Sequence, residues 1–262
     1  MKLATFIPPG GGQPRAGEVR GAQVVELQTG ETVLDRLRSG SLEPAAGPPH
    51  ALAEVALLAP HTPRAIFGIG LNYRGHAAEQ GKEPPEIPIV FLKLPTSAAP
   101  PGGPVRRPAV VRRLDYEGEL AVVMGAGGRV AGYAVADDVS ARDLQRREPQ
   151  WTRAKGADTF CPFGPWVTTA DEIADPEALT LRTWVNDELR QDASTSDLAF
   201  GIPALVAFLR EAITLEPGDL ILTGTPSGVG MALDPPCFLE AGDRVRIEIE
   251  GLGVIEHGVV DG

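Results

Sequence analysis

Residues 114–124 read LDYEGELAVVM, and this stretch carries the strongest structural signal in the chain. The apolar run from Leu120 to Met124 predicts a buried strand. Because side chains at positions i and i+2 of a strand lie on one face, Glu117 and Glu119 point the same way, with Asp115 behind them. Like charges this close together are costly in a core unless they are protonated or neutralised by a cation. The stretch therefore predicts a divalent-cation site, and the alternative is a solvated strand end that carries three acids.

A second acidic strand end follows. The apolar run at residues 130–138 ends in Asp137 and Asp138, and the glycine-rich residues 125–128 predict a turn that joins both runs as a hairpin. That hairpin would bring an aspartate beside the two glutamates and complete a cluster of three carboxylates. An all-oxygen site of this kind suits Mg²⁺, Mn²⁺ or Ca²⁺ rather than zinc. Directly afterwards, residues 140–145 predict the capped start of a helix.

The composition is that of an ordinary globular chain, and it excludes several functions. The 262 residues are 43% hydrophobic and carry a net charge of −11, which argues against binding to a phosphate backbone. No stretch approaches the roughly 20 apolar residues that cross a bilayer, and prolines interrupt the N-terminal segment before a signal sequence could form. We therefore expect a cytoplasmic protein with no nucleic-acid or membrane partner. Its cysteines, Cys161 and Cys237, are too few for a zinc motif or a disulfide framework.

The apolar runs predict two parts. Residues 1–60 indicate a small N-terminal α+β subdomain, with strands at 2–7 and 21–27, a helix near 32–39 and a proline-rich linker at 42–50. Residues 61–262 contain many short apolar runs between glycines and prolines, and a few helical runs such as 203–210. We expect strands at 65–69, 89–92, 120–124, 133–136, 166–168, 181–185, 220–222 and 244–249. The pattern favours an α+β fold that is mainly β, not an alternating βαβ sheet.

Two glycine-rich stretches invite a nucleotide-binding interpretation, and neither fits it. Residues 68–73 follow a strand, but Tyr73 stands where a dinucleotide fingerprint has glycine and no long helix follows. Residues 223–230 lack the lysine of a phosphate loop, and Pro226 removes an amide donor. The second stretch still offers backbone N–H groups at a strand end, so it predicts either a cradle for a carboxylate or a simple tight turn.

Six blocks of sequence, taken in order, resemble the fumarylacetoacetate hydrolase family. They cover about three quarters of the chain, from about residue 64 to its end. The blocks are GLNYRGHAAE (70–79), DYEGE (115–119), DVSARDLQ (138–145), KGADTFCPFGP (155–165), VNDELRQ (185–191) and LEPGDLILTGTPSGVG (215–230).

The resemblance implies a mixed β-roll or sandwich-like catalytic domain in a homodimer, with one Mg²⁺ or Mn²⁺ per subunit and a small 2-oxo acid as substrate. By their positions in the matching blocks, Glu117, Glu119 and Asp138 correspond to the metal ligands. Lys155 corresponds to the active-site lysine, and His76 with Glu79 to the pair that activates water in the hydrolases. The substrate-contacting positions correspond to Arg142, Gln145 and Thr225.

The residues themselves are compatible with this chemistry. A 2-oxo acid can chelate a divalent cation, which then stabilises an enolate as a Lewis acid. Lys155 could offset charge on the oxyanion, although an isolated lysine is more often a surface residue. His76 and Glu79 share one face if residues 73–80 form a helical turn, so that the carboxylate could fix the imidazole tautomer; an exposed polar helix is the alternative. The charged, proline-containing segment 72–88 is typical of a mobile lid.

The leading functional hypothesis is an isomerase or decarboxylase of aromatic catabolism that acts on 2-hydroxyhepta-2,4-diene-1,7-dioate or a similar dicarboxylic 2-oxo or 2-hydroxydienoic acid. An acylpyruvate hydrolase and an oxaloacetate decarboxylase are alternatives, because the same residues could serve all three reactions. A Ca²⁺-stabilised β protein without catalytic activity is an alternative of another class, and it leaves His76 and Lys155 without a role.

Overall fold

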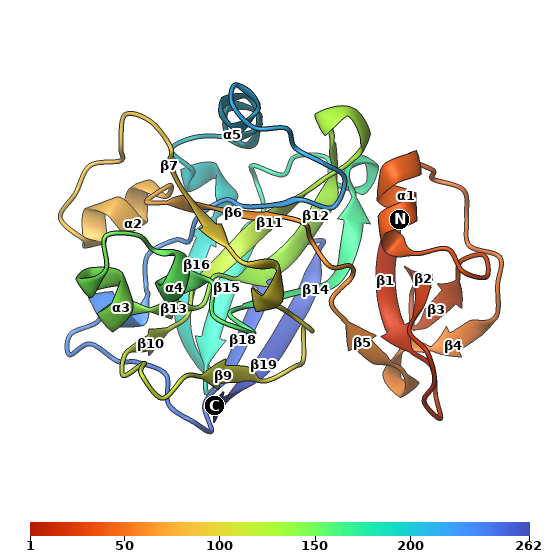
Figure 1. Ribbon diagram of the computed structural model, residues 1–262, viewed down its shortest axis with the longest axis horizontal. Helices are drawn as coiled ribbons and strands as arrows, with labels where there is room; N and C mark the ends of the chain where they lie inside the picture. Colours follow the sequence, from red (N-terminus) through yellow and green to blue (C-terminus); the bar gives the residue numbers. More distant parts are fainter.

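The computed structural model describes all 262 residues and is built mainly from strands, with short helices around them (Figure 1). The twelve strands of the larger sheet are β1 (Lys2–Ile7), β2 (Arg15–Arg20), β3 (Gln23–Glu26), β4 (Pro49–Ala51), β5 (Ala56–Leu58), β6 (Ile66–Gly70), β7 (Ile89–Lys93), β8 (Ala98–Ala99), β11 (Gly118–Met124), β12 (Val130–Asp137), β14 (Cys161–Thr169) and β17 (Leu220–Leu222). Their main order is β4-β3-β2-β1-β14-β12-β11-β17-β6-β7, with β5 paired to β1 and β8 to β14.

Five further strands form a second sheet in the order β16 (Glu188–Ser194), β15 (Thr180–Val185), β18 (Arg244–Ile249), β19 (Gly253–Asp261) and β9 (Val105–Arg107). A small two-stranded sheet pairs β10 (Leu114–Asp115) with β13 (Ser140–Ala141). The α-helices are α1 (Val33–Ser39), α2 (Arg74–Glu79), α3 (Arg142–Arg147), α4 (Thr152–Lys155) and α5 (Ile202–Arg210). The α+β, mainly β fold predicted from the sequence is confirmed.

The predicted hairpin, β11 with β12, lies at the centre of the larger sheet. The two strands are antiparallel, and Gly118 pairs with Asp137 at the end nearest the acids. Every residue of β11 is buried, because the strand has a hydrophobic core on each face. Leu120 and Val122 pack into the larger core, while Ala121 and Val123 pack into the smaller one. The alternation predicted for a strand is therefore present, with apolar partners on both sides.

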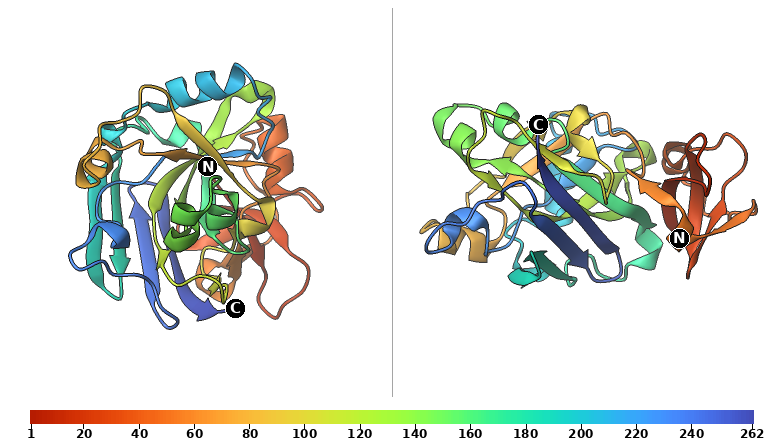
Figure 2. Two further views of the ribbon diagram at one scale, coloured as in Figure 1. Left: turned by 60° about the vertical axis from the view of Figure 1, so that its left-hand side comes forward. Right: turned by 90° about the horizontal axis from the view of Figure 1, so that it is seen from below.

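The five-stranded sheet covers the larger core. Leu181, Ile247 and Ile255 from its three middle strands join the same hydrophobic cluster as Leu120 of the hairpin. The two views of Figure 2 show this sheet, in teal and blue, beside the hairpin. Helix α5 packs against the same cluster and is the longest helix, with nine residues. No helix of the structure is both long and apolar enough to cross a membrane.

The N-terminal residues form one end of the larger sheet, at the right of Figure 1. Strand β1 pairs with β14, so Leu3 lies opposite Val167. Helix α1 begins after Thr32, whose side chain accepts the N–H of Asp35 while the Asp35 carboxylate accepts the N–H of Thr32. This capping box explains why a short helix forms there. The division near residue 60 stays a prediction, and the hydrogen bonds between β1 and β14 join both parts in one sheet.

One local prediction was wrong. Ser140 does not cap a helix, because Ser140 and Ala141 form β13, and the Ser140 hydroxyl donates to the carbonyl of Asp138 at 2.9 Å. Helix α3 begins at Arg142 and has no side-chain cap. The pairing of β13 with β10 keeps this segment extended for two more residues. It thereby moves the start of α3 to the edge of the site described below.

Candidate active site

A cavity of about 550 Å³ opens where α2, α3 and α4 gather around the ends of β6, β7 and β11. Eight of the nine residues predicted from the sequence line it, namely His76, Glu79, Glu117, Glu119, Arg142, Gln145, Lys155 and Thr225. The ninth, Asp138, is fully buried and lies against Glu117 and Glu119. We call the side chains of Glu117, Glu119 and Asp138 the floor of the cavity.

Backbone hydrogen bonds of the hairpin hold the floor together. The N–H of Asp138 donates to the carbonyl of Glu117 at 2.9 Å, and the N–H of Glu117 donates to Asp137 Oδ1 at 2.8 Å. One carboxylate oxygen from each of the three floor residues lies within 4.8 Å of the other two. The residue between the two glutamates is Gly118, and the position favours glycine because a Cβ there would overlap the side chain of Thr183. The three-carboxylate cluster expected from the hairpin is therefore present.

Cations neutralise two of the three floor carboxylates. Lys155 Nζ lies 2.5 Å from Glu117 Oε2 and 2.6 Å from Asp138 Oδ2, and Lys93 Nζ lies 2.6 Å from Asp138 Oδ1. Burial disfavours the charged form of Glu117, but Arg142 and Lys155 outweigh it and hold its pKa below the usual range. Burial likewise opposes the charge of Lys155, while Asp138 and Glu117 raise its pKa above the ordinary value. The ion pair between Lys155 and Glu117 therefore stays charged in spite of its burial.

Glu119 is the floor carboxylate for which the protein supplies no cation. Its carboxylate accepts the N–H of Gly224 at 2.7 Å, and no lysine or arginine forms an ion pair with it. Burial, together with repulsion from Asp138 and Glu117, raises the pKa of Glu119 well above its usual value. A buried carboxylate in this position is stabilised by an additional positive charge.

The charges around the floor fit a divalent cation. Together with Asp115, the three floor residues make four carboxylates, and the three cations in contact with them are Lys93, Lys155 and Arg142. With Glu119 ionised, as the binding of a cation requires, one negative charge remains, and a divalent cation would leave a single positive charge that suits an anionic ligand. Carboxylate oxygens are the donors that Mg²⁺ and Mn²⁺ prefer. Glu117, Glu119 and Asp138 could hold such an ion.

Arg142 forms ion pairs with two carboxylates of the protein. Its Nε donates to Asp115 at 2.8 Å, its Nη2 donates to Glu117 at 2.6 Å, and its Nη1 donates to the side-chain oxygen of Gln145 at 3.1 Å. The guanidinium lines the cavity but is almost fully buried. Its predicted contact with substrate stays a prediction. Its hydrogen bonds also orient the side chains of Glu117 and Gln145.

His76 and Glu79 form the predicted pair on α2. His76 Nδ1 lies 2.5 Å from Glu79 Oε1, and the second oxygen of Glu79 accepts the N–H of Gly228 at 2.9 Å. His76 is only 4% exposed, so the alternative of an exposed polar helix does not apply. A proton on Nδ1 shared with the carboxylate leaves Nε2 as an acceptor, and the Gln80 amide lies 2.9 Å from it.

Hydrogen bonds connect the N-terminal end of helix α2 to two segments that are distant in the sequence. Asn72 is fully buried, and its side-chain amide donates to the carbonyls of Thr223 and Phe200 at 2.8 Å and 3.0 Å. The N–H of Gly75 donates to Asp197 at 2.8 Å. These contacts hold residues 72–79 in place over the cavity. Within the segment predicted as a lid, residues 80–88 are all exposed or half-buried, whereas Asn72, Tyr73, His76 and Ala77 are buried.

The loop predicted to cradle a carboxylate binds carboxylates of the protein itself. The N–H groups of Gly224, Gly228 and Gly230 donate to Glu119, Glu79 and Asp115, respectively. Thr225 lines the cavity, and its hydroxyl donates to the carbonyl of Gly118 at 3.0 Å while accepting from Gln191 at 2.8 Å. The loop is thus a support for the floor and for α2.

Sequence reasoning missed two buried supports of the floor. Lys93 is the last residue of the apolar strand β7, and this position was the only indication in the sequence of its role. His257 Nε2 lies 2.9 Å from Asp137 Oδ2, and both side chains are fully buried. Asp137 in turn accepts the N–H of Glu117, so this pair positions a floor residue from the far strand β19. No local pattern links His257 to the hairpin.

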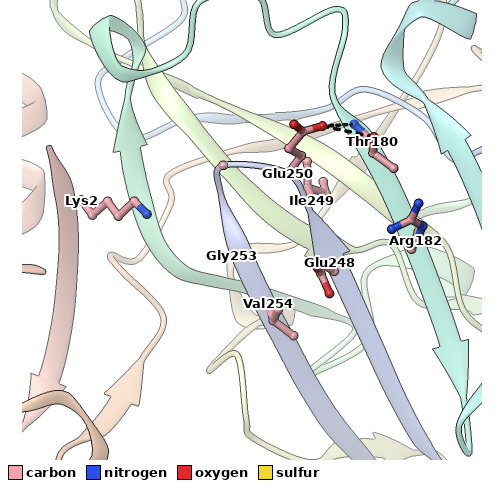
Figure 3. Close-up of a pocket in the computed structure, with 9 residues that line it drawn as sticks. Lys2, Thr180, Arg182, Glu248, Ile249, Glu250, Gly253 and Val254 are labelled. Atoms are coloured by element: carbon pink, nitrogen blue, oxygen red, sulfur yellow. Dashed lines mark hydrogen bonds between the residues drawn. The ribbon is translucent and has the colours of Figure 1, made fainter. Parts of the chain in front are cut away.

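A second hollow, of about 400 Å³, lies on the surface between β1 and the five-stranded sheet (Figure 3). Its charged side chains include Lys2, Arg182, Glu248 and Glu250, so both signs are mixed. Glu250 accepts a hydrogen bond from the Thr180 hydroxyl at 3.1 Å. The floor of the first cavity is the only group of three side chains in the structure with metal-ligand spacing. The chemistry therefore belongs to the first cavity.

Several known proteins are similar to this chain. Oxaloacetate tautomerase YisK of Bacillus subtilis is 44% identical over 225 residues, which cover 80% of this chain and 75% of that protein. The mitochondrial oxaloacetate tautomerase fahd2 of Xenopus laevis is 45% identical over 221 residues, or 79% and 69% of the two chains. The crystal structure of 2-hydroxyhepta-2,4-diene-1,7-dioate isomerase from Mycobacterium marinum has a TM-score of 0.82 at 38% identity, with 100% and 98% coverage.

The family model that matches is the fumarylacetoacetate (FAA) hydrolase C-terminal model, over residues 65–260. All nine residues predicted from the sequence lie within this range. The matched range contains the hairpin, the three helices at the cavity and the loop that supports them. The resemblance noted from the sequence blocks is confirmed, and the chain belongs to the fumarylacetoacetate hydrolase family of enzymes.

Proposed function

We propose that the protein is a divalent-cation-dependent isomerase that interconverts the enol and keto forms of a 2-oxo dicarboxylate, with oxaloacetate as the substrate. The observation that carries the proposal is the pairing of the buried His76 with Glu79, both of which line the same cavity as the carboxylate floor. The names of the relatives support it. Two are oxaloacetate tautomerases, the solved neighbour is an isomerase of a 2-hydroxydienoic acid, and both reactions move a proton between an enol and a ketone.

Each residue has a role in this proton shift. When bound by Glu117, Glu119 and Asp138, the divalent cation supplies a Lewis acid for the 2-oxo group. His76 Nε2 removes the proton from carbon 3, the electron pair of that C–H bond becomes the carbon–carbon double bond, and the π pair of the C=O group moves to oxygen to give an enolate. The enolate oxygen then takes up one proton, returned by the His76 imidazolium directly or through solvent, which gives the enol and restores neutral His76; the reverse order of steps converts the enol to the ketone. Glu79 holds the imidazole in the tautomer that accepts this proton. The ammonium of Lys155 stabilises the negative charge that develops on the former keto oxygen.

Gln145 and Gln80 complete the binding surface. The carbonyl of Gln145 accepts from Arg142, so its amide N–H groups remain available to the carboxylate next to the keto group. The amide of Gln80 lies 2.9 Å from His76 Nε2, on the wall of the cavity. The substrate must displace that amide before His76 can take a proton from it.

One assay separates the proposed reaction from the alternatives. The purified enzyme with Mg²⁺ or Mn²⁺ is given enol oxaloacetate, and loss of enol absorbance and release of CO₂ are followed together. The proposal predicts fast loss of the enol without extra CO₂. Stoichiometric CO₂ would indicate a decarboxylase, cleavage of an added acylpyruvate would indicate a hydrolase, and bound metal without turnover would indicate the calcium-stabilised alternative.

A second candidate is isomerisation of a longer 2-hydroxydienoic dicarboxylate. It is favoured by the apolar wall of the cavity, where the rings of Phe91 and Trp151 pack 5.5 Å apart beside Ile89. This wall offers a four-carbon acid little to contact, whereas a conjugated chain would lie along it. The discriminating measurement is the ratio of kcat/KM for a 2-hydroxydienoic dicarboxylate to that for enol oxaloacetate.

A further inference from the structure

Helix α3 carries positive charge from the floor of the cavity outward. Arg142, Gln145 and Arg146 share one face of α3, because residues three and four apart on a helix are neighbours, and all three line the cavity. Arg142 is buried and bound to Asp115 and Glu117. Arg146 is one turn farther along and is exposed. The outer charge is therefore the one that a ligand can reach.

Arg146 has no carboxylate partner in the protein. The adjacent Arg147 pairs with Glu148 at 3.5 Å, and Arg153 pairs with the same carboxylate at 2.7 Å, but neither lines the cavity. Arg146 lines the cavity and forms no ion pair within 4 Å. In a chain with a net charge of −11, an arginine without a carboxylate partner beside this cavity is available to an anionic ligand.

A second uncompensated cation lies on the α2 side of the same cavity. Lys82 is exposed, lines the cavity and donates only to the side-chain oxygen of Gln80, at 3.3 Å. We call Lys82 and Arg146 the mouth of the cavity. The same cavity is also lined by the apolar side chains of Phe91 and Trp151, whose rings pack against each other. The cavity is thus cation-binding at the floor, apolar along one wall and positive at its entrance.

We infer that Lys82 and Arg146 bind the distal carboxylate of a 2-oxo dicarboxylate and so select dicarboxylates over monocarboxylates. The inference rests on the proposed function in one respect, that the 2-oxo acid end of the ligand lies at the floor. A ligand with a second carboxylate would then extend that charge towards these two cations, with its carbon chain against Phe91 and Trp151. Partly solvated charge-assisted contacts of this kind account for roughly three- to tenfold each in affinity.

Calorimetry in the presence of saturating Mg²⁺ tests the inference with a matched pair of ligands. 2-Oxoglutarate and 2-oxopentanoate have the same five-carbon chain and differ only in the distal carboxylate. The wild-type enzyme should bind 2-oxoglutarate at least about tenfold more tightly. Arg146→Gln should reduce this ratio roughly three- to tenfold, Lys82→Gln should reduce it by a similar or smaller factor, and the double variant should bind both acids about equally.

The controls isolate the charge at the mouth. Arg147→Gln removes a neighbouring positive charge that does not line the cavity, and it should keep the wild-type ratio. Oxalate ends at the floor, so Arg146→Gln should change its affinity by less than about twofold. Equal binding of both five-carbon acids by the wild type, or an unchanged ratio in the double variant, would overturn the inference.

The same measurements keep the inference separate from the proposed function. If the wild type turns over no 2-oxo acid but shows the predicted ratio, the isomerase proposal fails and the subsite stands. If enol oxaloacetate is converted while the double variant keeps the wild-type ratio, the subsite fails and the isomerase stands.

Discussion

The floor of the cavity is built by strands, and its mouth is built by short helices and the segment that follows α2. At the floor, Glu117, Glu119 and Asp138 are at most 5% exposed, and hydrogen bonds to residues of β7, β12, α4 and the loop at 223–230 hold them. At the mouth, Lys82 and Arg146 are exposed and have no ionic partner. Charges at the floor act in a medium of low polarity, whereas charges at the mouth are solvated and screened by salt.

This difference separates the reaction from the choice of substrate. A fixed, buried cluster suits the binding of one cation and the stabilisation of one developing charge, and a change there should cost orders of magnitude in rate. Solvated cations contribute modestly and can be altered without disturbing the fold, so changes at the mouth should alter the ratio of affinities for related acids. Predictions for Glu119, Lys155 and His76 test the catalytic half of this comparison, and the calorimetric experiment on Arg146 tests the half that concerns substrate choice. A prediction for His61 concerns stability away from both regions.

Glu119→Gln should have the largest effect, the loss of divalent-cation binding and at least about 10³-fold lower kcat. Glutamine resembles the protonated acid, and burial with repulsion from Asp138 and Glu117 already favours protonation, so the metal-free Tm should not fall. Mg²⁺ should raise the Tm of the wild type and leave that of the variant unchanged. Glu248→Gln, in the surface hollow of Figure 3, is the control. Wild-type metal stoichiometry in Glu119→Gln would refute the assignment of the floor.

Lys155→Met should lower kcat by roughly 10²-fold, the scale expected for one lost donor to an oxyanion, while the metal still binds. A matched control is available, because Lys155 lies 5.0 Å from the ring of Phe91 and Lys2 lies 5.2 Å from the ring of Trp166. Lys2→Met removes a similar cation–π contact on the surface and should leave kcat unchanged. Near-native kcat in Lys155→Met would reduce Lys155 to a structural ion pair.

A smaller effect is predicted remote from both regions, at His61. The buried imidazole donates to the carbonyl of Gly218 from Nε2 at 2.8 Å, and burial lowers the pKa of His61 to about 4. Below pH 6.5 His61 binds a proton in the unfolded chain but stays neutral in the folded chain. The free energy of unfolding therefore decreases as the pH falls towards 4. The loss between pH 7 and 5 should be about 2 kcal/mol, and urea unfolding should show it in the wild type but not in His61→Gln. Between pH 7 and 8 the two proteins should show the same pH dependence; a difference there would contradict this account.

The sequence predicted the hairpin and the floor because both depend on local rules. Alternation along β11 and the acids at i and i+2 need no tertiary information. Lys93 and His257 could not be found this way, since they reach the floor from β7 and β19, far along the chain. Local rules also misplaced the start of α3, because the pairing of β13 with β10 overrides the capping preference of Ser140. Local rules predicted that N–H groups of the loop at 223–230 could bind a carboxylate. They could not show that the carboxylates bound there are Glu119 and Glu79 of the protein, because tertiary contacts bring these residues to the loop.

The most direct test of the central claim is proton exchange at carbon 3 of 2-oxoglutarate, followed by NMR in D₂O with Mg²⁺. If His76 is the base, the wild type should exchange this position, and His76→Ala should do so roughly 10²- to 10⁴-fold more slowly while it still binds Mg²⁺ and oxalate. Exchange at the wild-type rate in His76→Ala would show that another group moves the proton. Loss of Mg²⁺ binding in that variant would show that His76 belongs to the metal site, and either result would contradict the proposed division between base and floor.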